Sequence, residues 1–72
     1  MKLLILKTDI ESQEKVDMIR PLFYQNPIIY AWSVDLHDID KVLRVEASDD
    51  LRQEDLIFLI QKYGFYCEEL ED

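Results

Sequence analysis

The apolar positions of this chain change their period several times, and each change marks the boundary of an expected element. Residues 3–8 alternate as a strand does, which places Leu4 and Leu6 on one face and Leu3 and Ile5 on the other. The chain is therefore expected to begin with a strand.

The segment that follows has the period of a helix. From Glu11 or Ser12 onward the apolar residues recur at helical spacing and form one stripe, made of Val16, Ile19, Leu22 and Phe23. Ser12 is a suitable N-cap, and Glu14 adds negative charge to the first turn, which the helix dipole favours. Pro21 predicts a bend or an early end of the helix, because proline lacks a backbone N–H. Asn26 and Pro27 should end the segment.

A hairpin is expected next. Residues 28–36 are rich in β-branched and aromatic side chains, and their alternation puts Tyr30, Trp32 and Val34 opposite Ile29, Ala31, Ser33 and Asp35. The polar residues 37–40 predict a turn. Residues 41–47 then alternate as a strand, with Leu43, Val45 and Ala47 opposite Val42, Arg44 and Glu46.

The last third of the chain predicts a second helix and a short strand. After a loop at 48–50, the helical stripe contains Leu56, Leu59, Ile60 and Tyr63, and Leu51 is placed to pack onto Leu56. Gly64 fits the C′ position, where a left-handed residue ends a helix. Residues 65–70 predict the last strand, and Glu71 and Asp72 are expected to fray.

This order of elements, βαββαβ, predicts the fold. Seventy-two residues are enough for one domain, residues 1–72. With right-handed crossovers, the order gives an α+β, ferredoxin-like domain with a four-stranded antiparallel sheet and two helices on one face. The other face of the sheet is then left without a helix.

Charge and composition argue against several classes of function. The net charge is −8 and the eight basic residues are scattered, which argues against nucleic acid and anionic membranes as partners. We expect a cytoplasmic protein, because there is no signal-peptide pattern, no apolar run of about 20 residues and only one cysteine, Cys67. Neither a nucleophile–base pair nor a phosphate-binding glycine loop is present, so we expect no enzyme and no cofactor.

Four segments together resemble the heavy-metal-associated domain of small copper chaperones and metal-pumping ATPases. They are LKTDI at 6–10, WSVD at 32–35, VLRVEA at 42–47 and IQKYGF at 60–65, and the resemblance covers roughly residues 3–70. In that family the strand–helix loop carries M-x-C-x-x-C, whose thiolates bind a soft ion such as Cu(I) or Zn(II). The alignment puts Ile10, Ser12 and Lys15 at these positions, so the resemblance implies a metal-binding fold without its soft-metal ligands.

A hard-cation site and the roles of three single residues are also considered. Hard cations take oxygen ligands, and one end of the sheet should carry Asp9, Glu11, Glu14, His37, Asp38 and Asp40; because nothing in the sequence forces these side chains together, a solvated acidic surface is the simpler interpretation. We interpret Cys67 as a small buried hydrophobe, His37 as a turn residue and Trp32 as part of the core.

The uncovered face of the sheet predicts an interface. The strand pattern places Leu3, Ile5, Ile29, Ala31, Val42, Tyr66 and Leu70 there, with Lys7, Arg44, Glu46 and Glu68 across them. An apolar patch on such a face favours a protein partner or a homodimer. The expected function is thus a protein-interaction or regulatory module, and the alternative is a metallochaperone-like protein that binds metal through non-cysteine ligands or a partner's ligands.

Overall fold

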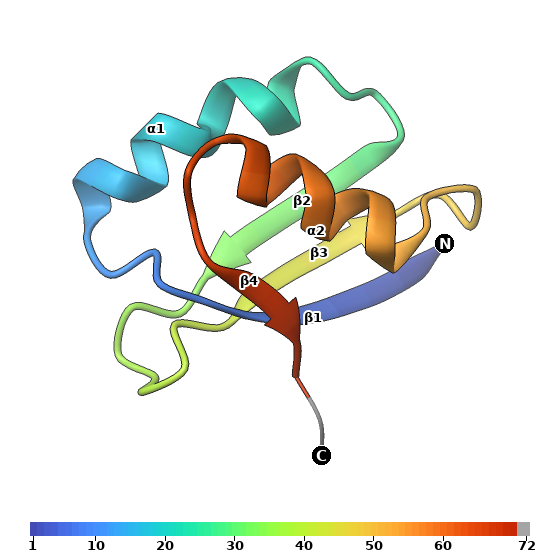
Figure 1. Cartoon of the computed structure of the whole chain (residues 1–72). Helices are drawn as coiled ribbons and strands as arrows, with labels where there is room; N and C mark the ends of the chain where they lie inside the picture. The colour runs from blue at the N-terminus through green and yellow to red at the C-terminus, as the bar shows by residue number, and fades with distance from the viewer. Residues whose placement is uncertain (71–72) are drawn as a thin grey trace.

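A computed structural model describes residues 1–70 and confirms the predicted order of elements. The elements are β1 (Lys2–Thr8), α1 (Gln13–Tyr24), β2 (Ile29–Val34), β3 (Leu43–Ala47), α2 (Gln53–Lys62) and β4 (Cys67–Glu69). The strands form one antiparallel sheet in the order β2-β3-β1-β4, and both helices lie on the same side of it (Figure 1). This is the expected ferredoxin-like fold. Glu71 and Asp72, which we expected to fray, lie outside the described residues.

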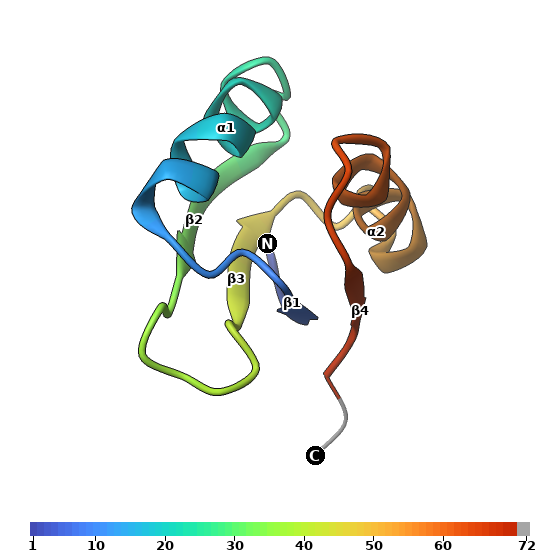
Figure 2. The same ribbon diagram turned by 60° about the vertical axis from the view of Figure 1, so that its left-hand side comes forward.

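The core lies between the sheet and the two helices. Leu4 and Leu6 of β1 lie opposite Val45 and Leu43 of β3, and all four are buried. The helices close this layer with the stripes expected from the sequence, which supply Val16, Ile19, Leu22, Phe23, Leu56 and Ile60. In a second view, no helix or strand of residues 1–70 lies on the opposite side of the sheet (Figure 2).

Helix α1 begins as predicted but does not end early. The Lys15 N–H donates to Ser12 Oγ at 3.2 Å, which makes Ser12 the N-cap. Pro21 lies inside the helix, which continues to Tyr24, so the early end that we allowed for is wrong. The next two residues, Leu22 and Phe23, are buried in the core, and this packing outweighs the backbone hydrogen bond that the proline removes.

Strand β2 begins with an irregularity that our prediction missed. Ile29 lies opposite Ala47, but Ala31 lies opposite Glu46, so the register shifts between them. Ile29 consequently joins the core below the helices, whereas Tyr30, expected on the core side, is exposed. The placement of Ile29 on the uncovered face is wrong, because one extra residue reverses the alternation of a strand.

Val42 is also misplaced in the predicted patch, because it is only 3% exposed. It lies just before β3, where the loop from β2 folds against the sheet. The Asp35 N–H donates to the Val42 carbonyl at 2.9 Å, and the Thr8 N–H donates to the Asp40 carbonyl at 3.1 Å. These bonds join the loop to the neighbouring strands, and the buried Val42 adds nothing to the exposed apolar surface.

The end of α2 follows the predicted C-cap chemistry. Gly64 has a φ of 92°, in the left-handed region, and the Phe65 N–H donates to the Ile60 carbonyl at 3.4 Å. Tyr63 is the C-cap and is 38% exposed, so its expected place in the core stripe is wrong. Neither helix in residues 1–70 combines the length and the apolar character that crossing a bilayer demands.

Candidate functional site

The junction loop, residues 9–12 between β1 and α1, is held from both sides. On one side Thr8 Oγ1 donates to the Lys41 carbonyl at 2.6 Å and accepts from the Ile10 N–H at 3.2 Å. On the other side Asp9 Oδ1 accepts from the Tyr66 N–H at 2.9 Å, just before β4. The loop is thus fixed to two strands that neighbour β1 in the sheet.

The three positions aligned with the metal motif are all engaged within the chain. Ile10 is fully buried and fills the space below the loop. Ser12 Oγ accepts from the Lys15 N–H, and Lys15 Nζ forms an ion pair with Glu11 Oε1 at 2.8 Å. Their hydrogen bond lowers the pKa of the Glu11 carboxyl and raises the pKa of the Lys15 ammonium, so both groups are charged at neutral pH. An ammonium has no lone pair to offer a metal.

The acidic side chains at this end do not converge. Asp9 and Glu11 are engaged as described, and Asp38 Oδ1 accepts from the Asp40 N–H at 2.8 Å within its own turn. Asp35 likewise accepts from the His37 N–H at 3.0 Å. Within residues 1–70, no three His, Cys, Asp or Glu side chains are grouped so as to hold a metal ion. The hard-cation site considered from the sequence therefore gains no support from the fold.

Cys67 lies beside the junction loop, opposite Thr8 in the β1–β4 register. Its side chain is 2% exposed and belongs to the core, as interpreted from the sequence. Burial, with a smaller contribution from the charges of Asp9 and Glu68, raises the pKa of the thiol to about 11. Metals and electrophiles react with the thiolate, so this buried and protonated thiol is a poor ligand.

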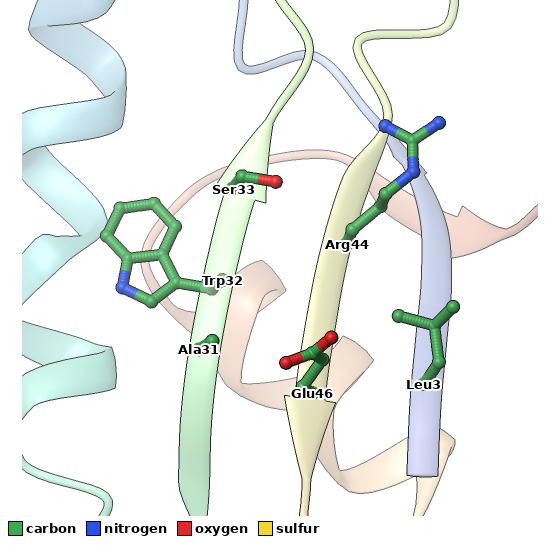
Figure 3. A pocket seen from close by; sticks show the side chains of 6 residues that line it. All are labelled: Leu3, Ala31, Trp32, Ser33, Arg44 and Glu46. Carbon is green, nitrogen blue, oxygen red and sulfur yellow. The ribbon is translucent and has the colours of Figure 1, made fainter.

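The second candidate surface is the open face, defined as the side of the sheet away from the helices. Register places two rows of three side chains next to each other on it: Ala31, Glu46 and Leu3 in one row, and Ser33, Arg44 and Ile5 in the other. Five of these six residues and Trp32 line a shallow hollow of about 400 Å³ (Figure 3). Leu3 is 55% exposed, and together with the half-buried Ile5 and the exposed Ala31 it makes this part of the open face apolar.

Charged residues cross this face, as the sequence suggested. Lys7 Nζ lies 3.7 Å from Asp40 and 3.9 Å from Glu68, at the border with β4. Arg44 and Glu46 form no ion pair with any other residue that the structure describes. The predicted interface residues Leu3, Ile5 and Ala31 therefore lie together on the open face beside a neutral pair of charges.

The remaining predicted interface residue, Tyr66, lies just before β4 at the border of the sheet. It is 47% exposed, and its hydrogen bond with Glu68 raises the pKa of its phenol. Among the contacts that the sequence did not reveal are the Glu11–Lys15 ion pair and the Asp9–Tyr66 hydrogen bond. The first had a signal in the i, i+4 spacing, whereas the second joins residues 57 positions apart and had none.

Trp32 belongs to the structure of the domain. Its ring stacks on Phe23 with centroids 4.4 Å apart and an angle of 21° between planes, and the Arg20 Cζ lies 5.4 Å from its centroid. These contacts pack α1 against β2. The interpretation of Trp32 as part of the core is supported.

Comparison with known proteins identifies the fold. No family model matches the chain, and no curated protein matches it in sequence. A solved structure described as "Crosstalk between Cu(I) and Zn(II) homeostasis" superposes with a TM-score of 0.80 at 11% identity, over 97% of this chain and all of the other. A second, "CsoZ metallochaperone", gives a TM-score of 0.75 at 15% identity, over 93% of this chain and 96% of the other. This chain thus has the ferredoxin-like fold that its sequence predicted, and it shares that fold with both of these structures.

Proposed function

We propose that this chain is a non-enzymatic interaction domain that binds no soft metal at its junction loop and works through the open face of its sheet. The observation that carries the proposal is the Lys15–Glu11 ion pair at 2.8 Å, which occupies the place of the second thiolate in the family motif. Metal handling by the same fold is the second candidate.

The chemistry of the loop supports the first part of the proposal. Soft ions select thiolates, and a serine hydroxyl is a weak substitute. Ser12 is already engaged as an N-cap, and a cation bound there would lie close to the Lys15 ammonium. The one thiol in the chain, Cys67, is buried and protonated at neutral pH. None of these groups offers a soft ion an accessible thiolate.

The distribution of titratable groups supports the non-enzymatic part. The one histidine, His37, is exposed in the loop between β2 and β3. The pKa of the Glu11 carboxyl and the pKa of the Asp17 carboxyl are both lowered by their hydrogen-bonded partners, Lys15 and Arg20, which is the opposite of what a general acid needs near pH 7. We therefore find no nucleophile, base and positioning group within residues 1–70 that could act together in catalysis.

The second candidate function rests on the fold. Both superposed structures carry names that refer to metal homeostasis or a metallochaperone, and both match nearly the whole of this chain. If this chain handled metal, the site would lie at the junction loop and would use non-cysteine ligands of the chain or ligands added by a partner. An experiment on the loop separates the two candidates.

The test is a metal titration followed by amide NMR. The ¹⁵N-labelled chain is titrated in turn with Cu(I), Zn(II), Ca(II) and Mg(II), and the amides of residues 8–16 are followed. The proposal predicts no saturable shift of these amides at micromolar metal. Saturable shifts confined to the junction loop would instead establish metal handling.

A further inference from the structure

We propose that the open face binds a second copy of this chain, in a two-fold face-to-face homodimer in which Arg44 of each copy pairs with the partner's Glu46. The inference rests on the proposed function, because it names the partner of the same surface. It follows from the register of β1, β2 and β3.

The register gives the open face a simple order. Glu46 lies between Leu3 and Ala31 in one row, and Arg44 lies between Ile5 and Ser33 in the next row. Each row therefore has a charged centre, an aliphatic residue on the β1 side and a small residue on the β2 side. The charges at the two centres are opposite.

This order is complementary to itself under one symmetry operation. A two-fold axis that lies between two facing copies, and crosses the strands midway between the rows, exchanges one row with the other. Glu46 then faces the partner's Arg44, and Arg44 faces the partner's Glu46. On the β1 side the same operation sets Leu3 against the partner's Ile5. Both charge pairs and both aliphatic contacts form at once, and the β3 strands run antiparallel across the interface.

The charge of the molecule favours this face over the others. The whole chain carries −8, yet the open face carries Lys7 and Arg44 against Glu46 and Glu68, with Asp40 beside Lys7 at its border. Two copies joined through this face keep the acidic remainder of each copy on the outside. Because Arg44 and Glu46 form no ion pair with another described residue, neither must leave a partner to form the dimer.

The face is small for a protein–protein interface, so we expect a weak dimer. With strands about 4.8 Å apart and about 3.4 Å per residue, the face covers roughly 400 Å², about half of the area that a standard interface buries on each partner. The dimer should therefore be weak and depend on concentration, with a dissociation constant between about 10 µM and about 1 mM.

The test is a charge exchange followed by sedimentation. The wild type, R44E, E46R and the R44E/E46R double variant are compared from about 10 µM to about 1 mM. Each single variant sets like charges against each other and should raise the dissociation constant at least about tenfold. The double variant restores opposite charges under the same symmetry, so its dissociation constant should return to within about threefold of the wild type. An equimolar mixture of the two single variants should associate, although neither does alone.

The E46R variant also separates pairing from general repulsion. It makes the net charge two units less negative, so an association limited only by overall repulsion would tighten in this variant, whereas the proposed pairing predicts that it weakens. Circular dichroism of each variant verifies the fold. The dilution series of the wild type needs no substitution and stands even if a variant misfolds.

Two results would overturn the homodimer: a wild type that stays monomeric up to 1 mM (on the order of the weakest interfaces), or a double variant that associates no better than the single ones. If the chain is monomeric and the metal titration shows no shifts, the homodimer is wrong, but the proposed interaction domain remains, with a different protein as the partner of this face. A metal response at residues 8–16 would overturn the proposed function, whatever the oligomeric state.

Discussion

Introducing two thiols should turn the junction loop into a soft-metal site. The change is Ser12→Cys with Lys15→Cys, which places two thiols at the spacing of the family motif above the buried Ile10. Because the backbone of the loop is fixed by Thr8 and by the Asp9–Tyr66 bond, neither of which is altered, the variant should keep the geometry of the loop.

The structure sets the expected stability of this variant. Loss of the Ser12 cap should lower the free energy of unfolding by about 1 kcal/mol, and loss of the exposed Glu11–Lys15 pair should add little because solvent screens it. For a domain of this size that is a fall in Tm of roughly 4–8 °C without metal. Free metal at about 100 times its dissociation constant adds about 2.7 kcal/mol, so Tm should then rise by roughly 10–20 °C.

The assay is thermal unfolding with and without Cu(I) or Zn(II) under reducing conditions. Ser12→Ala is the matched control, because it removes the cap and adds no ligand; its Tm should fall and show no response to metal. A folded double-cysteine variant that gains no stability from either ion would refute the claim that this loop has the shape of a metal-binding loop. A wild type that gains stability from Cu(I) would refute the claim that it lacks the site.

Three further predictions concern the structure around the loop and the second helix. The pKa of the buried Cys67 thiol is raised, so the thiol stabilises the fold below the unfolded-state pKa near 9, and this stabilisation is lost as pH rises towards 11. In urea unfolding, the wild type should therefore lose roughly 2–3 kcal/mol of its free energy of unfolding over that pH range relative to Cys67→Ala. Gly64→Ala should lower the free energy of unfolding by about 1–2 kcal/mol, and Gly64→Asn by less, because φ is 92° and no atom within 4 Å adds a steric term; equal losses in both variants would contradict this. Thr8→Val should cost about 1–3 kcal/mol in urea unfolding because it removes the partner of the Ile10 N–H and the Lys41 carbonyl, whereas Thr8→Ser should restore most of the loss if the hydroxyl is responsible.

The elements of this fold could be predicted from the sequence because their signals are local. Helical stripes, the Ser12 cap and the C′ glycine at 64 each depend on residues within a few positions, and all three are found in the structure. The early end of α1 failed because burial of the residues after Pro21 is a tertiary effect. Helix propensity alone does not include the free energy of this tertiary packing.

The open face was predicted less well, because strict alternation was assumed throughout the strands. One irregularity near the start of β2 places Ile29 in the core, and Val42, just before β3, is buried instead of exposed. Both effects depend on pairing with β3 and not on the identity of the residues themselves. Leu3 and Ile5 lie where β1 pairs regularly with β3, and Ala31 lies just after the irregularity of β2, so all three keep the face that simple alternation predicts.

At the junction loop, the missing thiols could be read directly from the sequence, but the contacts that hold the loop could not. The Asp9–Tyr66 hydrogen bond joins two ends of the chain that meet only when β4 pairs with β1. The pKa of Cys67 likewise depends on its burial in the assembled core.

The central claim is that the working surface of this domain is the open face and not the junction loop. The most direct measurement is a dilution series of the wild-type chain, followed by amide NMR, with every shift mapped onto the fold. The account predicts that the concentration-dependent shifts fall on Leu3, Ile5, Ala31, Arg44 and Glu46, while the amides of the junction loop do not move. Shifts centred on residues 9–15 or on the helices, with none on the open face, would contradict it.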